Sequence, residues 1–281
     1  MYLISQVANW TIIFIIQVDA QLNTPMYFFV SILALMDIGL TSCSAPKLLA
    51  NIFSKKKSIS FAGCFLQLHF LVSFGNTTLC LLAIKAVDRY IAISKPLHYA
   101  LLMNKRIQVR LVAGSWLIAS VHSTAHSIPA SRLFYCESNE IQHYFCDLLP
   151  LFKLSCSDTS LNELLLLIET SLFLLTPFFI IVISYILIIS AIWKMRTREG
   201  RSKAFSTCSS HLFVVVMTYA PLLYIYIRPA SIYLLNKDII ISVLYTMGCS
   251  LLNPFVYSIR NKEVKRALTK VLNKTVFSFN K

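Results

Sequence analysis

Hydrophobic residues lie in seven long runs along the chain, and short polar segments separate the runs. They cover residues 2–18, 25–52, 61–93, 111–129, 164–193, 204–227 and 239–259. A helix of about 20 apolar residues crosses a lipid bilayer, so runs of this length predict membrane-spanning helices. We therefore expect an all-α membrane protein: a seven-transmembrane helix bundle that forms one domain over residues 1–281 and ends in a cytoplasmic tail at 260–281.

The composition supports a membrane protein and argues against a nucleic-acid partner. Apolar residues make up 57% of the chain and charged residues only 14%, which is too few charges to cover a soluble globule of this size. The net charge of +14 is typical of some nucleic-acid-binding proteins. Here, however, the charges lie in blocks between apolar runs, without the interleaved aromatic residues of a nucleic-acid groove. The chain opens directly on apolar residues, so we expect no cleavable signal peptide.

Lysine and arginine are distributed unevenly among the segments between the runs. Most lie in segments 94–110, 194–203 and 260–281, which would share one side of the membrane. Cytoplasmic segments carry the excess of positive charge in membrane proteins, so the N-terminus is predicted to be extracellular and the C-terminus cytoplasmic. The basic cluster at 55–57 is a local exception to this rule. The basic segments are expected to contact acidic lipid headgroups.

The eight cysteines form two groups. Cys64 lies at the start of the third run, and Cys136, Cys146 and Cys156 follow at ten-residue intervals in the long segment 130–163. On the predicted topology all four face an oxidising compartment, where disulfides persist. Four cysteines allow three pairings, and the sequence alone does not choose among them. The others are interpreted as small packing residues: Cys43, Cys80, Cys208 and Cys249.

The third run ends in the segment IKAVDRYIAISKPLHY, residues 84–99. Its central Asp88 and Arg89 have a simple explanation, because an arginine at a helix end can extend to the lipid interface. Together with Tyr90 and the PLHY sequence, however, they resemble the DRY segment of rhodopsin-like (class A) G-protein-coupled receptors, in the variant of the olfactory receptors. The sequences LNTPMYFF, KAFSTCSSHL and NPFVY, at 22–29, 203–212 and 253–257, resemble further motifs of that family.

The resemblance to olfactory receptors implies a function. A small volatile odorant would bind inside the bundle and shift it toward a state that activates a heterotrimeric stimulatory G protein at the plasma membrane. The resemblance also implies the disulfides Cys64–Cys146 and Cys136–Cys156. The positions that match the family's activation and coupling motifs are Asp37, Asp88, Arg89, Tyr90, Tyr185, Asn253, Pro254 and Tyr257.

Asp37 lies in the middle of the second run, where an unpaired carboxylate costs several kcal/mol. A hydrogen bond to a neighbouring helix would satisfy it. The resemblance adds a second interpretation, a sodium- or water-linked site shared with Asn253. We expect no other cofactor.

A ligand would bind toward the extracellular third of the bundle, among the third, fifth and sixth helices. The motifs place these candidates there: Leu71, Val72, Gly75, Asn76, Glu169, Phe173, Tyr219, Leu222, Leu223, Tyr226 and Thr246. Most are apolar or aromatic, which suits a small volatile molecule, although such stripes commonly pack in a core. The carboxylate of Glu169 predicts a ligand with an amine or another hydrogen-bond donor.

Catalytic and metal-binding sequence patterns are absent. There is no Ser-His-Asp arrangement, glycine-rich phosphate loop or HExxH motif, so an enzyme is not expected. Cys208 and His211 have C-x-x-H spacing, and His122 and His126 are one helical turn apart. Neither pair has the further ligands that a metal site needs, so no metal is expected.

Departures from the family pattern keep two other hypotheses open. Ala8–Asn9 stands in place of a GN pair with few residues before it, no N-x-S/T sequence is placed for glycosylation, and Lys85 replaces the usual Met. The second hypothesis is therefore a shortened or degenerate receptor-derived chain that does not signal. The third is a channel or transporter, but Asp37, Lys85 and Glu169 show no symmetry between the two halves of the chain.

Overall fold

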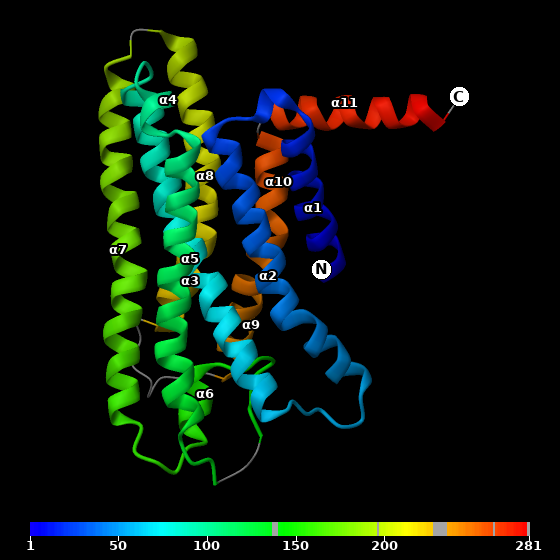
Figure 1. The fold of residues 1–281 in the computed structure, drawn as a ribbon, viewed down its shortest axis with the longest axis vertical. Helices are drawn as coiled ribbons and strands as arrows, with labels where there is room; N and C mark the ends of the chain where they lie inside the picture. The colour runs from blue at the N-terminus through cyan, green and yellow to red at the C-terminus, as the bar shows by residue number, and fades with distance from the viewer. Residues whose placement is uncertain (137–139, 196, 227–234, 261, 280–281) are drawn as a thin grey trace.

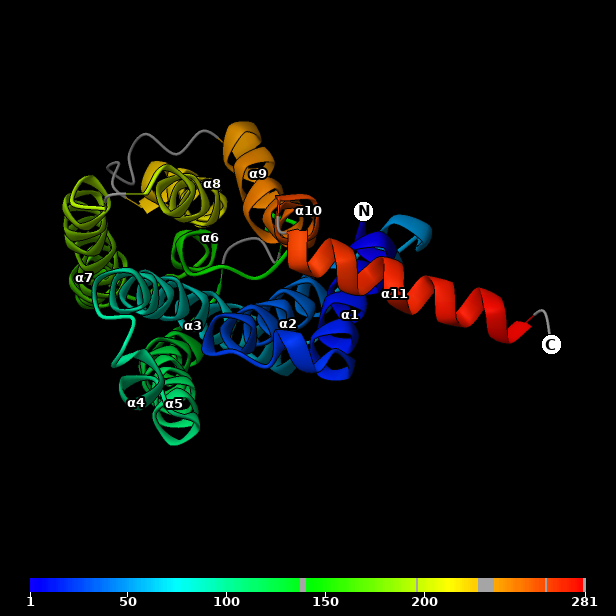
Figure 2. The same ribbon diagram turned by 90° about the horizontal axis from the view of Figure 1, so that it is seen from above.

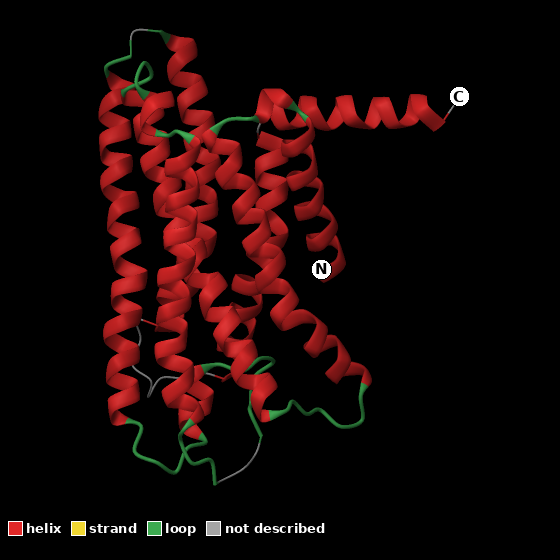
Figure 3. Cartoon of the chain, in the orientation of Figure 1, coloured by secondary structure: helices red, strands yellow, loops and turns green. Residues whose placement is uncertain are grey.

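The long helices of the chain form a bundle. The structure, a computed structural model, describes residues 1–136, 140–195, 197–226, 235–260 and 262–279, without the side chains of 169, 203, 226, 235–236, 258–260, 262 and 272–279. Its long segments are α1 (Tyr2–Val18), α2 (Pro25–Phe53), α3 (Phe61–Ser94), α5 (Lys105–Ser131), α7 (Ser160–Trp193), α8 (Arg198–Tyr226) and the consecutive α9 (Leu235–Val243), η3 (Leu244–Cys249) and α10 (Ser250–Arg260). They run along the molecule (Figure 1), and the described chain is almost entirely helical (Figure 3). The predicted helix bundle is confirmed.

Short elements lie at the two ends of the bundle. One end carries η1 (Ala20–Leu22), α4 (Tyr99–Leu102) and α11 (Lys262–Phe279), and the other carries α6 (Leu148–Lys153) (Figure 1). We refer to these as the α4 end and the α6 end. Helices α5 and α8 begin at the α4 end and α11 lies there, so most basic residues are at that end, whereas the basic cluster at 55–57 lies in the connection between α2 and α3 at the α6 end (Figure 1).

Two of the long helices, α3 and α5, begin with a side-chain cap. The side chain of Ser60 accepts a hydrogen bond from the Gly63 amide at the start of α3, and Asn104 accepts one from the Ile107 amide at the start of α5. Both satisfy amides that have no partner within the helix. Pro25 begins α2, where its missing N–H costs nothing.

The predicted runs coincide with the helical segments and differ from them at the ends. The predicted start at 111 is wrong for α5, which begins at Lys105, and α8 begins at Arg198 rather than 204. Hydropathy detects only the part of a helix that lies in lipid, whereas these helices continue beyond it with basic residues. Among the described residues, five segments are long and apolar enough to cross a membrane, and α1 is apolar but shorter.

The predicted tail at 260–281 is mostly helical, because α11 occupies most of it. This helix leaves the bundle sideways at the α4 end (Figure 1). The Tyr27 hydroxyl donates to the Glu263 carboxylate at 2.7 Å, and the Lys270 ammonium lies 3.5 Å from the Asp19 carboxylate. Val264 and Ala267, three residues apart, are buried against the bundle, a helical spacing that the sequence prediction overlooked.

Helix α3 lies at the centre of the bundle and packs against α2, α5 and α7 (Figure 2). Its small and aliphatic residues Leu81, Leu82 and Ala86 are completely buried in the main core. Because it touches helices on several sides, α3 can carry side chains both to a ligand cavity at one end and to a coupling surface at the other.

The segment between α5 and α7 is ordered by covalent and hydrogen-bonded contacts. The disulfides Cys64–Cys146 and Cys136–Cys156 are both present, the first tying the segment to α3. Helix α6 then turns inward and lies within the ring of long helices when the bundle is seen end-on (Figure 2). Its buried residues Leu148, Leu151 and Phe152 form a second core around the Cys64–Cys146 bridge.

The seventh segment is not the continuous α-helix that the run 239–259 predicts. It contains the π-helical turn η3 between α9 and α10. A π-turn widens the helix locally and redirects its side chains, and such turns occur often at functional sites. Here it lies beside α2 and α8 at the level of a cavity.

Candidate functional site

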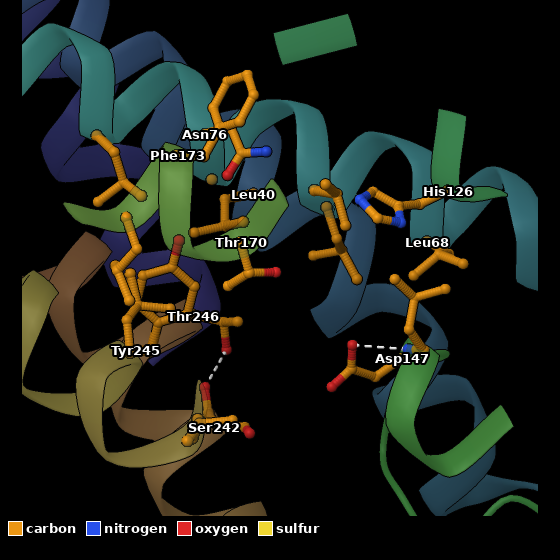
Figure 4. Close-up of a pocket in the computed structure, with 18 of the residues that line it drawn as sticks. Leu40, Leu68, Asn76, His126, Asp147, Thr170, Phe173, Ser242, Tyr245 and Thr246 are labelled. Atoms are coloured by element: carbon orange, nitrogen blue, oxygen red, sulfur yellow. Dashed lines mark hydrogen bonds between the residues drawn. The ribbon is translucent and has the colours of Figure 1, made fainter. Parts of the chain in front are cut away.

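A cavity lies inside the bundle toward the α6 end (Figure 4). The space between its lining atoms is about 900 Å³, including open space at its mouth. Most of the wall is apolar and comes from α3, α7 and α8, while polar groups enter from α5, η3 and the loop before α6. A cavity of this kind suits a small, mainly apolar ligand that makes a few hydrogen bonds.

The first polar region of the cavity joins α3, α5 and α7. The Asn76 amide nitrogen lies 2.9 Å from His122 Nδ1, and the imidazole of His122 packs on the Phe173 ring at a centroid distance of 4.1 Å. His126 lies 4.6 Å from His122 between ring centroids, and His126 and Thr170 both line the cavity (Figure 4). These side chains provide both donors and acceptors for a ligand.

The second polar region comes from the seventh segment. Thr246 donates a hydrogen bond to the Ser242 carbonyl at 2.9 Å, and both residues line the cavity with Tyr245 (Figure 4). A Cβ atom added at Gly75 would lie only 2.8 Å from the Tyr245 hydroxyl oxygen. Gly75 therefore lets the tyrosine of η3 approach α3 closely.

The loop before α6 covers the outer end of the cavity. The Tyr144 hydroxyl lies 2.6 Å from the Thr246 hydroxyl, and the Cys146 amide donates to Gln67 Oε1 at 3.0 Å. Gln67 in turn donates to the Cys43 carbonyl at 2.8 Å, so the loop is linked to both α2 and α3.

Two titratable groups of this loop lie beside the cavity. Burial raises the pKa of the Asp147 carboxyl above its ordinary value and lowers the pKa of the His143 imidazole below its ordinary value. Attraction between the charged forms of the two groups opposes both shifts. Asp147 Oδ1 also accepts a hydrogen bond from the Leu148 amide at 2.8 Å, so it caps α6 (Figure 4).

The structure brings many of the sequence-predicted ligand residues together. Those that line the cavity are Leu71, Val72, Gly75, Asn76, Phe173, Leu222 and Thr246. Tyr219 and Leu223 do not line it: Tyr219 packs against Phe178 in the core at a ring-centroid distance of 5.4 Å, and Leu223 packs on the same core. The side chains of Glu169 and Tyr226 lie outside the described residues.

The sequence did not predict several further lining residues, and six of these are polar. They include His122, His126, Asp147, Thr170, Ser242 and Tyr245. Ser242 and Thr246 are one helical turn apart, a signal that could have been read from the sequence. The spacing of His122 and His126 in the sequence indicates a metal-binding pair and does not indicate a cavity wall. Among the described residues no group of three or more His, Cys, Asp or Glu is arranged to hold a metal ion.

Deeper in the bundle, the buried carboxylate of Asp37 accepts hydrogen bonds from the seventh segment. Its Oδ1 accepts a hydrogen bond from the Ser250 hydroxyl at 3.0 Å, and its Oδ2 accepts one from the Asn253 amide at 2.9 Å. These bonds offset the cost of burying the carboxylate. They connect α2 to α10 directly before Pro254, where the helix lacks one backbone donor.

The remaining motif residues gather toward the α4 end. Asp88 accepts a hydrogen bond from the Tyr99 hydroxyl of α4 at 2.8 Å, while Arg89 and Tyr90 are half-buried. The Tyr185 hydroxyl lies 2.8 Å from His211 Nδ1 and donates to the Cys208 carbonyl at 3.2 Å. Tyr185 thus connects α7 to the KAFSTCSSHL segment of α8.

Lys85 adds a cation to this region from the C-terminal third of α3. Its side chain is only 3% exposed, and its ammonium donates to the Tyr257 hydroxyl at 2.6 Å. The ammonium also lies 4.2 Å from the centroid of the Tyr257 ring, in a cation–π contact. Lys85 therefore connects α3 to the NPFVY segment of α10.

A seven-helix bundle with a loop-covered cavity, a buried Asp37–Asn253 contact and a DRY segment defines a rhodopsin-like G-protein-coupled receptor. Residues 1–275 match the family model described as "Olfactory receptor". The chain is 45% identical to olfactory receptor 1f45 of Rattus norvegicus over 272 residues, 97% of this chain and 87% of that protein. It is 45% identical to olfactory receptor 1C1 of Homo sapiens over 278 residues, 99% of this chain and 88% of that protein. The chain belongs to the olfactory receptor family, whose members are receptors and not enzymes.

Proposed function

We infer that this chain is an odorant-activated receptor that couples to a stimulatory heterotrimeric G protein. The observation that carries the inference is the loop-covered cavity in the bundle, which shares α3 with the motif residues at the α4 end. Its apolar wall offers area to a small volatile molecule, and its two polar regions offer orienting hydrogen bonds.

Activation in this proposal is a shift between two populations of the bundle. A ligand that contacts Leu222 of α8 together with α3 and η3 would favour a state in which the α4 end of α8 moves outward. The Tyr185 contacts to Cys208 and His211 would then break, and Arg89 would become accessible to the G protein. The C-terminal half of α3 thereby transmits the binding event.

The proposed topology places the α6 end outside the cell and the α4 end inside. It puts the disulfides in an oxidising compartment and most basic residues on the cytoplasmic side. The basic segments 194–203 and 260–270 would then meet acidic lipid headgroups and the G protein. Antibody staining of tags at the two termini in intact and permeabilised cells tests this orientation.

The sodium ion expected near Asp37 remains a proposal. The carboxylate and the Ser250 hydroxyl are oxygen ligands of the type that hard cations prefer. Replacing sodium chloride with choline chloride during agonist titration tests it, and an unchanged agonist potency would contradict it.

A screen of a broad odorant panel in cells that display the receptor tests the function itself. A member of the panel should raise cyclic nucleotide levels with the wild type and fail to do so with Arg89→Ala at equal surface staining. Lack of surface staining for the wild type would favour the degenerate-chain hypothesis instead. Glu169→Gln, tested with a matched amine and alcohol, examines the predicted amine preference.

A further inference from the structure

A second hollow lies on the outer face of the bundle, between α3, α5 and α7. It measures about 780 Å³, including open space, and its walls are mostly apolar. They include Cys80 and Ile84 of α3, Ser115 of α5, and Phe173, Thr176 and Ile180 of α7. Thr176 and Ile180 are exposed on the outside of the bundle, where a membrane protein meets lipid chains. We call this hollow the lateral groove.

Phe173 is common to the lateral groove and the ligand cavity. Its ring packs on His122 at the cavity wall, and the residue is only partly buried. One aromatic ring therefore forms part of the wall between the lipid-facing groove and the cavity.

The backbone beneath Phe173 is weakened by a proline. Pro177 lies four residues further along α7, and it has no N–H to donate to the carbonyl of Phe173. The proline ring also crowds that carbonyl. Helices bend most readily at such positions, so the turn that carries Phe173 is easier to deform than the rest of α7.

The α6 end offers a more restricted route into the cavity. A larger hollow there faces water and shares Phe145 and Cys146 with the cavity. The loop between the two is held by the Cys64–Cys146 disulfide and by the Tyr144 contact to Thr246. Entry from water would require several of these restraints to yield, whereas Phe173 is the one lining residue that the lateral groove and the cavity share.

We propose that the lateral groove is the entrance through which an apolar ligand dissolved in the bilayer reaches the cavity, with Phe173 as its gate. The inference depends on the proposed function, because it assumes that the cavity holds a small apolar ligand. Such a ligand concentrates in the hydrocarbon region and meets the mostly apolar groove there. The residues of the groove then set how fast a ligand enters and leaves, while those of the cavity set how tightly it binds.

The first test compares rates with equilibrium affinity. Thr176→Trp should fill the groove, because Thr176 lines the groove and not the cavity. Ile183→Trp is the matched control, since Ile183 lies seven residues further along the same face of α7, is 57% exposed and does not line the groove. With an agonist from the odorant panel, Thr176→Trp should slow both onset and decay of the response about tenfold and leave the half-maximal concentration nearly unchanged. Ile183→Trp should change neither.

Unchanged kinetics in Thr176→Trp, or equal slowing in Ile183→Trp, would overturn the proposal. Faster onset in Tyr144→Phe, which loosens the loop, would indicate entry from water and would also overturn it. If no odorant activates the wild type at equal surface staining, the proposed function fails.

A second measurement does not depend on signalling. Purified receptor in phosphatidylcholine vesicles is exposed to a medium-chain alcohol that carries a photoreactive diazirine, and the adducts are located by mass spectrometry. The wild type should label at Ile84 and Ile180 in the groove within short exposures and at Leu71 in the cavity later. Thr176→Trp should delay labelling at Leu71. Labelling at Leu71 that is equally fast in both proteins, or labelling confined to the groove at all times, would reject the groove as an entrance.

Discussion

Lys85 and Tyr257 offer the most direct test of the energetics inside the bundle. A buried ammonium costs several kcal/mol unless it is paired. The contacts described for Lys85 are one hydrogen bond of 2.6 Å and one cation–π contact of 4.2 Å, and both come from the same tyrosine. Tyr257→Phe keeps the ring and removes the hydroxyl, so it removes the hydrogen bond alone.

The size of the effect follows from the charge of the donor. A hydrogen bond to a charged group contributes about 1.5–3 kcal/mol, more than one between neutral groups. For a chain of this size that corresponds to a fall in melting temperature of about 3–10 °C. Lys85→Met removes the buried cation altogether and should raise the melting temperature, because an apolar residue of similar length avoids the desolvation cost. In the Lys85→Met background, Tyr257→Phe should then cost less than about 1 kcal/mol.

The assay is a double-mutant cycle. The four proteins are purified in one detergent and their thermal unfolding is followed by a thiol-reactive fluorophore and by circular dichroism. The coupling energy between the two positions should be at least about 0.5 kcal/mol. If Tyr257→Phe lowers the melting temperature equally with lysine or methionine at position 85, the inferred contact does not stabilise the protein and the reasoning is wrong.

Other contacts give further predictions. Gly75→Val should weaken agonist potency at least tenfold by displacing Tyr245, and the added Tyr245→Phe change should recover part of it; dose–response curves without any loss would contradict the close approach. Cys64→Ser should destabilise the loop by about 2–5 kcal/mol and reduce surface staining, whereas Cys43→Ser should not. Tyr144→Phe should increase hydrogen exchange of the loop amides roughly fivefold, from a loss of about 1 kcal/mol; exchange that stays at the wild-type rate would count against its 2.6 Å contact.

Local sequence was sufficient to predict the helices and to recognise the protein family. Apolar runs of bilayer length have few alternatives to helix, because lipid offers no partner to an exposed backbone amide. Capping residues such as Ser60 and Asn104 mark helix starts by chemistry that acts over three residues. Hydropathy did not predict the basic first turns of α5 and α8, because it detects only the apolar part of a helix.

The lining of the cavity could not be predicted from any single run of sequence, because its residues come from several helices and a loop. The resemblance to the family motifs predicted Leu71, Val72, Gly75 and Asn76 as ligand residues, and the structure has them on the cavity wall. Tyr219 was predicted on the same grounds but packs into the core, because the rotation of α8 about its axis is decided by its neighbours.

By itself, the sequence of this protein determined its apolar helices, the segments that carry most of its positive charge, and its family. Each of these depends on residues close together in the chain. Only the tertiary structure decided which polar groups meet: His122 with Asn76, the loop with η3, and the ammonium of Lys85 with Tyr257, 172 residues away. Such pairs form because a buried polar group must find a partner somewhere in the packed bundle, and the position of that partner is set by how the helices rotate, shift and widen against one another.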